Sequence, residues 1–328
     1  MQQVPRAVVA VLVAALALVA ACSSPAQAPS AAPATTDAPA TRTVTHALGT
    51  TGIPASPARV VSASVTMTGP LLGLDVPVVG TGTTRPGGVA DPNGFFLQWA
   101  GQAVDRGVAG LGGPTVRVES VAAQQPDVIV GSAVGADAVT PEIYAQLSAI
   151  APTIVLDHSR LSWQELSAQL GRDLGREAQA TAAEQEYTAR ASAVGAGLDT
   201  SREAVAMTVT DNGFNVFTAE SAQGRLLTGL GLRLKAVAPS GASGLGGSEV
   251  RRDVVPVAGE NAGIFGDASL FFVNATDEDV AGYRTAQPVL GSLPAFAENR
   301  VHALGPESFR LDRFSAAAVL DRLEQQGS

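Results

Sequence analysis

Residues 59–80 read RVVSASVTMTGPLLGLDVPVVG, and their pattern indicates the kind of fold that the chain adopts. The short apolar run Arg59–Ser64 favours a strand, and its serines mark the end of that strand. Thr68–Leu74 then has the pattern of a helix, and Val76–Gly80 that of a second strand. A strand, a helix and another strand in this order indicate a parallel sheet covered by helices, so we expect an α/β fold.

The same order recurs further along the chain. A helix is expected over Val118–Gln125, before the apolar strand Val128–Val130. Leu147–Ile150 leads in the same way into the strand Thr153–Leu156. These repeats predict an N-terminal α/β lobe over residues 43–161.

A helical segment and a second lobe follow. Residues 162–200 contain few strand formers, and Arg176–Val194 contains neither Gly nor Pro, which predicts a short helix and then a long one. Strand patterns resume at residues 204–210 and alternate with helical patterns to the C-terminus. Residues 201–328 are therefore expected to form a second α/β lobe.

The N-terminus has the features of an export signal. Arg6 precedes the run Ala7–Ala21, which consists only of Ala, Val and Leu and is too short to span a membrane as a mature helix. We expect residues 1–21 to be a signal peptide. Val19–Cys22, followed by two serines, has the pattern of a lipobox, and Cys22 is the sole cysteine of the chain. Lipidation of Cys22 would anchor the protein outside the cytoplasm, in the periplasm or at the cell surface; the alternative is an ordinary signal peptide with a chance cysteine.

The composition limits the possible functions. Residues 22–42 are mostly Pro, Ala, Ser and Thr and are expected to form a flexible linker. Of the 328 residues, 46% are hydrophobic, so the part of the chain after the linker can be stabilised by a hydrophobic core without disulfides. We expect it to act as a monomer. The net charge of −9 argues against a nucleic-acid partner.

No motif for catalysis or for a metal site is present. The sequence lacks G-x-S-x-G, G-x-x-x-x-G-K-[ST] and a strand-end G-x-G-x-x-G, so no nucleophile elbow or nucleotide site is indicated, and the protein is not expected to be an enzyme. The histidines, His46, His158 and His302, lie far apart without metal-ligand spacing.

Two glutamates occupy similar positions in the two lobes. Glu119 and Glu260 each begin a predicted helix shortly before an apolar strand. Carboxylates favour helix N-termini in any protein, so this pattern alone leaves open whether the two residues share a function.

Six stretches, in order along the chain, together resemble the class III (cluster A) substrate-binding proteins of iron-siderophore ABC importers, and within that family the members that bind ferric enterobactin. The stretches are RVVSASVTMTG (59–69), VADPNGF (89–95), QPDVIV (125–130), LSAIAPTIV (147–155), TAESAQG (218–224) and ESFRLD (307–312). They cover nearly the whole chain after residue 43.

The resemblance implies a fold and a function. The fold is two Rossmann-like lobes joined by a single long helix, with the ligand in the cleft between the lobes. The function is that of a lipoprotein that captures a ferric catecholate siderophore and delivers it to the permease subunits of an ABC importer. Because the siderophore already surrounds the iron, neither a cofactor nor protein metal ligands are implied.

The resemblance also implies which residues form the sites. Catecholate oxygens need arginines, and catechol rings need aromatic faces. Arg310, Arg251 and Phe217 match ligand-binding positions of the family, and Arg252 and Arg313 are neighbours that can contribute. A further arginine is expected just before Val89, where this chain has Gly88; Arg85 is the candidate replacement. Glu119 and Glu260 match the glutamates that dock onto arginines of the permease.

Other functions stay open at this stage. Hydroxamate siderophores and haem are bound by the same fold, although haem would require an axial ligand. From a different class, an α/β enzyme that processes siderophores is an alternative.

Overall fold

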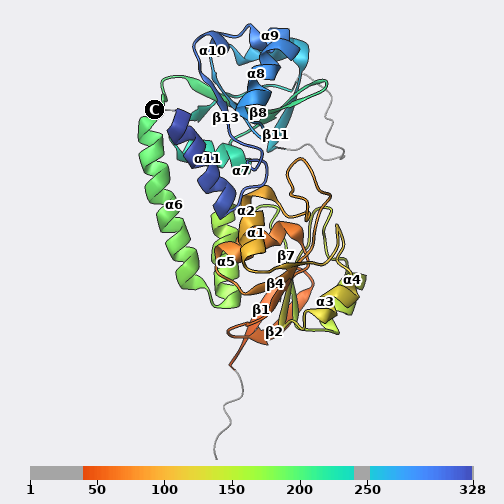
Figure 1. Cartoon of the computed structure of the whole chain (residues 1–328). Helices are drawn as coiled ribbons and strands as arrows, with labels where there is room; N and C mark the ends of the chain where they lie inside the picture. The colour runs from red at the N-terminus through yellow and green to blue at the C-terminus, as the bar shows by residue number, and fades with distance from the viewer. Residues whose placement is uncertain (1–39, 240–251, 327–328) are drawn as a thin grey trace, which may run out of the picture. The chain divides into compact units, whose positions relative to one another are not determined.

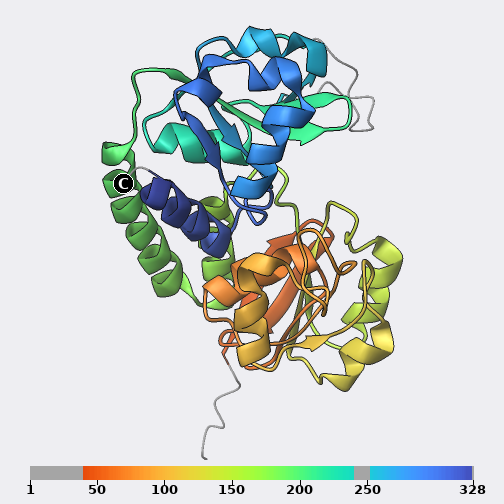
Figure 2. The same ribbon diagram turned by 45° about the horizontal axis from the view of Figure 1, so that its top comes forward.

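Two large sheets covered by helices, together with a two-stranded hairpin, make up residues 40–239 and 252–326, the part of the chain that the computed structural model describes (Figure 1). All of these residues belong to one compact unit. Figure 2 shows the two sheets in separate lobes, with helix α6 (Glu177–Gly197) running along both. The expected signal peptide, Cys22 and Arg251 lie outside the described residues.

The sheet of the N-terminal lobe is parallel throughout, in the order β5-β4-β3-β6-β7. The strand, helix and strand predicted over residues 59–80 are confirmed as β3, α1 and β4. The lobe contains β1 (Thr41–His46), β2 (Gly49–Pro54), β3 (Val60–Ser62), α1 (Val65–Gly73), β4 (Val78–Thr81), α2 (Leu97–Asp105), β5 (Ala109–Gly110), α3 (Val118–Ala123), β6 (Val128–Ser132), α4 (Pro141–Ser148) and β7 (Thr153–Leu156).

Both faces of this sheet are buried. Val60 belongs to the core on one face, which α1, α2 and α5 (Trp163–Leu174) cover, whereas Val61 belongs to the core on the other face, with Val121 of α3 and Leu147 of α4. Successive strand residues point to opposite faces, so strands covered on both sides are apolar throughout. This explains why β3, β6 and β7 are continuous apolar runs in the sequence rather than alternating ones.

The first strands of the structure were not expected. The antiparallel hairpin β1–β2 begins at Thr41, so the last two residues of the segment 22–42, expected as linker, lie in a strand. The hairpin is rich in Thr, as the preceding segment is, so its composition did not separate it from the expected linker. It is attached to the lobe by β7, where the amide of Ala47 donates to the carbonyl of Val155 (2.8 Å).

Helices α5 and α6 connect the lobes. Ser162 and Glu165 form a capping box at the start of α5, and Gly175 ends it with a left-handed backbone (φ 70°). The long helix predicted over Arg176–Val194 is confirmed as α6, with 21 residues.

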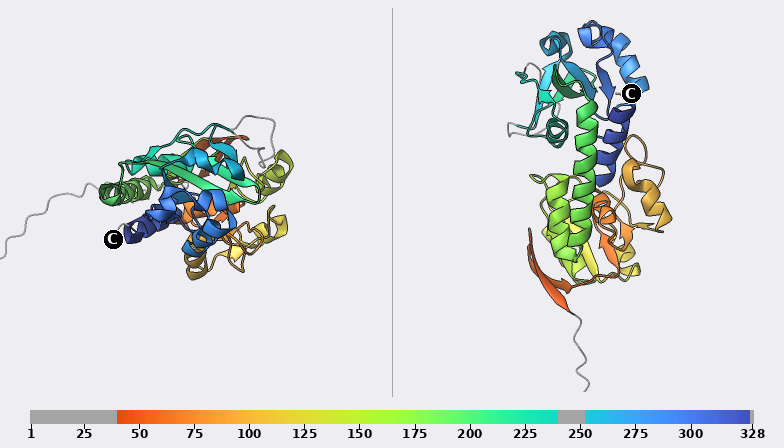
Figure 3. Two further views of the ribbon diagram at one scale, coloured as in Figure 1. Left: turned by 90° about the horizontal axis from the view of Figure 1, so that it is seen from above. Right: turned by 90° about the vertical axis from the view of Figure 1, so that its left-hand side faces the viewer.

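Small side chains let α6 lie close to both lobes. Its residue Ala180 belongs to the N-terminal core, and Ala191 and Val194 belong to the C-terminal core. One continuous helix is therefore packed into both lobes (Figure 3).

The C-terminal lobe is built on a mixed sheet in the order β11-β9-β8-β12-β13, with β10 beside the start of β8. Strands β8, β12 and β13 are parallel, and β9 is antiparallel to both of its neighbours. The lobe contains β8 (Glu203–Thr210), β9 (Gly213–Phe217), α7 (Ala222–Gly229), β10 (Arg233–Leu234), β11 (Val254–Ala258), the 3-10 helix η1 (Gly259–Phe265), β12 (Ser269–Phe272), α8 (Asp277–Ala286), α9 (Pro288–Gly291), α10 (Pro294–Ala297), β13 (Val301–Ala303) and α11 (Arg313–Gln326).

The last helix, α11, joins the two lobes. Its residues Ala316, Val319 and Leu320 are part of the C-terminal core, while the helix also packs against α6 and against α1 and α2 of the N-terminal lobe. Figure 3 shows α11 running beside α6. The start of α11 is thus placed at the junction between the lobes.

A buried carboxylate, that of Asp312, lies at this junction. Its Oδ1 accepts from the amides of Phe314 and Ser315 (both 2.9 Å), which caps the free N–H groups of α11. Its Oδ2 faces the N-terminal lobe, where Gln98 donates to it (3.4 Å). A Cβ on Gly69 of α1 would lie 2.1 Å from that oxygen, so only glycine fits there.

We expect Asp312 to make the stability depend on pH. Burial raises its pKa to about 6, above the ordinary value of 3.8, and hydrogen bonds offset only part of this. The folded protein therefore takes up a proton between pH 6 and pH 4 that the unfolded chain does not bind. The free energy of unfolding should consequently rise as the pH falls through this range, by on the order of 2–3 kcal/mol from this group.

Denaturant unfolding at several pH values checks this expectation. Asp312→Asn keeps the capping oxygen but cannot titrate, so it should lose this component of the pH dependence. Asp211→Asn, in the exposed turn between β8 and β9, serves as control and should keep the wild-type profile. Identical pH profiles for wild type and Asp312→Asn would contradict the assignment.

Candidate functional site

The loop between β13 and α11 presents two side chains toward the N-terminal lobe. Phe309 and Arg310 are both exposed, and 44% of Phe309 is accessible. Their backbone is held firmly: Gln223 of α7 donates to the carbonyls of Ser308 (3.0 Å) and Phe309 (2.7 Å). The buried hydroxyl of Ser308 also accepts from the amide of Asn274 (2.9 Å). Exposed side chains on a fixed backbone are suited to binding, because the backbone loses little conformational freedom on contact with a ligand.

Aromatic rings surround Arg310. Its guanidinium lies over the ring of Phe96 in the N-terminal lobe, 5.2 Å from the ring centre. The rings of Phe309 and Phe217 meet edge to face at 6.4 Å. A small hollow between the lobes is lined by Val89, Phe96, Gln98, Pro306, Glu307, Phe309 and Arg310. The lobes thus meet here with one cation and several aromatic faces.

The N-terminal side of this hollow is also preorganised. Asp91 accepts from the amides of Asn93 (2.9 Å) and Phe95 (2.8 Å), which closes the loop that leads into α2. Phe95 and Phe96 are buried and pack against Trp99 at ring-centre distances of 5.4 and 6.1 Å. Trp99 is therefore a natural optical reporter of the hollow.

His158 adds a polar group that the sequence did not single out. It follows β7, and its Nε2 is shielded from solvent without a hydrogen-bond partner among the described residues. Burial lowers its pKa; the charges of Asp137 and Asp157 oppose this, and the charge of Arg310 adds to it. A neutral imidazole therefore lies close enough to Arg310 to sense its charge. In the sequence, His158 was an isolated histidine, and no spacing pattern could have identified it.

The other predicted ligand-binding residues differ in position. Phe217 lies in the cluster, through its contact with Phe309. Arg252 is exposed and its loop adjoins Phe217, because the hydroxyl of Thr218 donates to the Arg252 carbonyl (2.6 Å). Arg85 is exposed on the loop before Val89, but no contact joins it to Arg310 within the described part of the chain. Arg251 lies outside the described residues, so its role stays a prediction.

The structure does not bring Arg313 to this cluster. Its guanidinium donates to the carbonyl of Gly73 in α1 (3.0 Å) and to Glu186 of α6 (2.7 Å). Arg313 begins α11, and the helix turns this side chain toward α6, away from the Phe309–Arg310 loop. Arg313 thus links the two lobes and α6 in this structure, and its expected contribution to ligand binding stays a prediction.

Glu119 and Glu260 lie at equivalent places in the two lobes. Glu119 is in the first turn of α3, and Glu260 is in the first turn of η1, directly after β11. Both side chains are exposed, and neither forms an ion pair or side-chain hydrogen bond with another described residue. Two carboxylates in this state are free to meet a partner.

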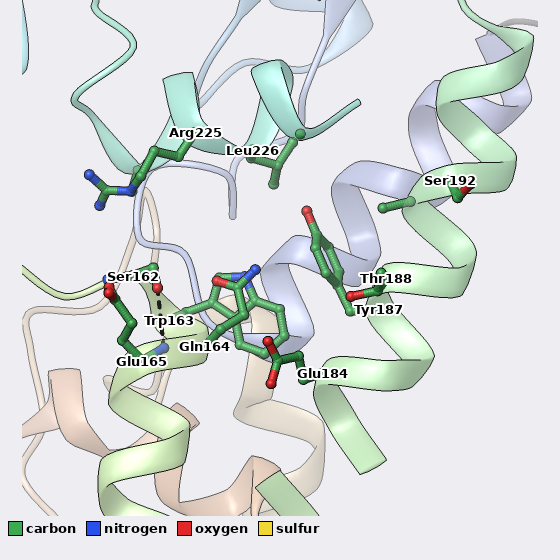
Figure 4. Close-up of a pocket in the computed structure, with 13 residues that line it drawn as sticks. Ser162, Trp163, Gln164, Glu165, Glu184, Tyr187, Thr188, Ser192, Arg225 and Leu226 are labelled. Carbon is green, nitrogen blue, oxygen red and sulfur yellow. Dashed lines mark hydrogen bonds between the residues drawn. The ribbon is translucent and has the colours of Figure 1, made fainter. Parts of the chain in front are cut away.

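A larger cavity lies beside α6, and it shares no lining residue with the hollow at Phe309 and Arg310. It has a volume of about 610 Å³ and is lined by α5, α6 and α7 (Figure 4). Gln223 of α7 holds the Phe309–Arg310 loop, whereas Arg225 and Leu226 of the same helix line this cavity. The two hollows therefore adjoin the same helix but are lined by different residues.

No candidate metal centre occurs in residues 40–239 and 252–326. Within these ranges, no three His, Cys, Asp or Glu side chains lie close enough together to hold a metal ion. Over the same residues, no helix combines the length and apolar character needed to cross a bilayer.

Two α/β lobes joined by a long helix, with an arginine and aromatic rings where the lobes meet, define a two-lobed solute-binding protein. The chain belongs to the periplasmic binding protein family, whose model matches residues 60–251. This agrees with the class III architecture expected from the sequence. Family membership also supports the expectation that the protein is not an enzyme, and it places the protein outside the cytoplasm.

Several relatives are similar over most of their length. The ferric enterobactin-binding periplasmic protein FepB of Escherichia coli is 39% identical over 289 residues, 86% of this chain and 90% of FepB. The crystal structure of holo-ViuP is 34% identical with a TM-score of 0.73, covering 86% of this chain and 93% of ViuP. A periplasmic solute binding protein from Mycobacterium smegmatis, at 24% identity, shares the fold with a TM-score of 0.67, over 87% of this chain and 97% of its own.

The probable siderophore-binding lipoprotein YfiY of Bacillus subtilis matches a smaller part. It is 36% identical over 129 residues, 38% of this chain and 36% of YfiY.

We expect Arg310 to contribute to the low pKa of His158, which burial lowers most. A positive charge disfavours the imidazolium form, so Arg310→Ala should raise the pKa of His158. Proton NMR titration of the imidazole measures this, with the resonance assigned through His158→Gln. Arg313→Ala removes an equal charge on the α6 side and is the control, which should leave the titration of His158 nearly unchanged. An unaltered midpoint in Arg310→Ala would show that the two groups are not coupled.

Proposed function

We propose that this protein is the substrate-binding component of an ABC importer and captures a ferric catecholate siderophore in the cleft between its lobes. The observation that carries the proposal is the 39% identity to FepB along 86% of the chain, because FepB is named for binding ferric enterobactin. The positions of Arg310, Phe309 and Phe96 support it independently.

The chemistry of the cluster suits such a ligand. A ferric catecholate presents anionic oxygens at the edge of flat rings. An arginine gives those oxygens charge-assisted hydrogen bonds, and phenylalanine faces pack on the rings. The iron is already chelated, so the protein needs no metal ligands of its own. Arg85, Arg251 and Arg252 are proposed to add positive charge as the ligand enters.

The cell-envelope location is proposed in more detail from the sequence. Residues 1–21 would be removed as a signal peptide, and Cys22 would carry the lipid, with the segment from Cys22 to the start of β1 as a linker. Mass spectrometry of the mature N-terminus tests this, and an unmodified Cys22 would exclude the anchor. The lobes are proposed as residues 43–161 and 201–328, with 162–200 between them, acting as a monomer.

Fluorescence titration with a panel of ligands tests the proposed function. Trp99 packs under Phe95 and Phe96, so a ligand in the cleft should quench its emission. Ferric enterobactin should bind more tightly than a ferric hydroxamate, haem or ferric ion alone. Tighter binding of a hydroxamate or of haem would assign another iron chelate, and hydrolysis of the siderophore would indicate an enzyme.

Arg310 and Arg313 should respond differently to substitution. Arg310→Ala should weaken binding of the ferric catecholate by about ten- to one-hundred-fold, corresponding to the loss of a charge-assisted hydrogen bond of roughly 1.5–3 kcal/mol, without a large change in Tm. Arg313→Ala removes an equal charge but should leave affinity nearly unchanged and lower Tm, because it links α1, α6 and α11. Weaker ligand binding in Arg313→Ala, with unchanged binding in Arg310→Ala, would place the ligand beside α6.

Delivery to the permease should depend on Glu119 and Glu260. We propose that these exposed carboxylates, one on each lobe, meet arginines of the permease. The double variant Glu119→Ala, Glu260→Ala should keep its affinity for the siderophore but lose uptake through the importer. Glu278→Ala, on the exposed start of α8, is a matched control and should transport normally. Normal uptake by the double variant would leave both glutamates with only the favourable charge that a carboxylate has near a helix N-terminus.

A further inference from the structure

The cavity beside α6 has features of a binding site in its own right. Its volume, about 610 Å³, lies within the range of small-molecule sites. The start of α5 forms one side, the middle of α6 another, and α7 of the C-terminal lobe closes it (Figure 4). It therefore lies between segments of both lobes, and its lining differs from that of the hollow at Arg310.

Two aromatic rings form a corner inside the cavity. The rings of Trp163 and Tyr187 meet edge to face, with their centres 5.0 Å apart and their planes at 89°. Burial raises the pKa of Tyr187 to about 12, so its phenol stays protonated and neutral. Figure 4 shows the Tyr187 hydroxyl directed toward Leu226 and the Glu184 carboxylate beside the two rings. Trp163 is buried and Tyr187 half-buried, so the corner offers the parts of these rings that line the cavity, next to a carboxylate.

The charges lining the cavity leave one carboxylate uncompensated. Glu165 is engaged in the capping box, where it accepts from the amide of Ser162 (2.7 Å). Hydrogen bonds from Ser162 lower the pKa of Glu165, and the positive charge of Arg225 contributes further. The carboxylate of Glu184, by contrast, has no hydrogen bond or ion pair with another described residue. The exposed Glu184 carboxylate therefore places a negative charge beside the aromatic corner that is not paired with another described residue.

We propose that this cavity binds an organic ammonium ion, with the cation against the Trp163–Tyr187 corner and its charge balanced by Glu184. Aromatic faces attract cations through the ring quadrupole, and the attraction increases where water is excluded. A simple inorganic cation would be held less well, since it would lose hydration without gaining contact with the rings. The proposed site is distinct from the hollow at Arg310, because the two share no lining residue.

Choline and its neutral isostere 3,3-dimethylbutan-1-ol are matched probes for this site. The mature protein is titrated with each, and calorimetry is the readout. Choline should bind saturably and the isostere at least about tenfold more weakly, because the two differ only in charge. Glu184→Gln should weaken choline binding by about tenfold, whereas Glu119→Gln, an equal change of charge in the N-terminal lobe, should not.

Each other outcome would overturn the proposal. Equal binding of choline and the neutral isostere would identify a plain apolar cavity, and absence of saturable choline binding would exclude a cation site. Unchanged affinity in Glu184→Gln would place the cation elsewhere. Displacement of choline by ferric enterobactin would show that the cavity belongs to the siderophore site. If the protein binds no siderophore at all, the choline experiment still decides the question by itself.

Discussion

The contact between the Asp312 carboxylate and the N-terminal lobe is the constraint on which the arrangement of the two lobes depends. One oxygen caps α11, a helix that belongs to the C-terminal core, while the other oxygen faces Gly69 and Gln98 of the N-terminal lobe. Burial raises the pKa of this carboxyl, so at neutral pH the ionised form is held against the cost of desolvation. Because Arg310 is only two residues away, the position of the proposed binding loop is fixed by the same contact.

Helix α6 supports this junction from the other side. Its buried residues are small, which lets α5 and α11 approach closely, and it contributes Ala180 to one core and Ala191 to the other. Arg313 joins it to both lobes through Glu186 and the carbonyl of Gly73. A continuous helix packed into two cores resists bending more than a pair of crossing strands would. Ligand binding is therefore expected to rearrange loops and side chains rather than to rotate one lobe far from the other.

The features that the sequence predicted are those set by local pattern. Strand β3, helix α1 and strand β4 follow from apolar runs of fixed period, and α6 follows from a run without Gly or Pro. Features set by side-chain direction were not predictable. Arg310 and Arg313 are neighbours in sequence, yet the start of α11 sends them to different sides of the chain. His158 and the Trp163–Tyr187 corner depend on contacts between separate elements, and neither left a spacing signal.

The distribution of charge around the cleft explains how a fixed site can accept a large anion. Arg310 belongs to the C-terminal lobe, and in this structure its charge is held over the Phe96 ring of the opposite lobe. His158, on the N-terminal side, is kept neutral by burial, so no second cation opposes Arg310 there. On the proposed function, catecholate oxygens would replace a weak cation–π contact with charge-assisted hydrogen bonds, and the freed Phe96 face would receive a catechol ring. Because both exchanges occur on a backbone that is already fixed by Gln223 and Asp91, discrimination among anions should come from their shape and ring faces more than from total charge.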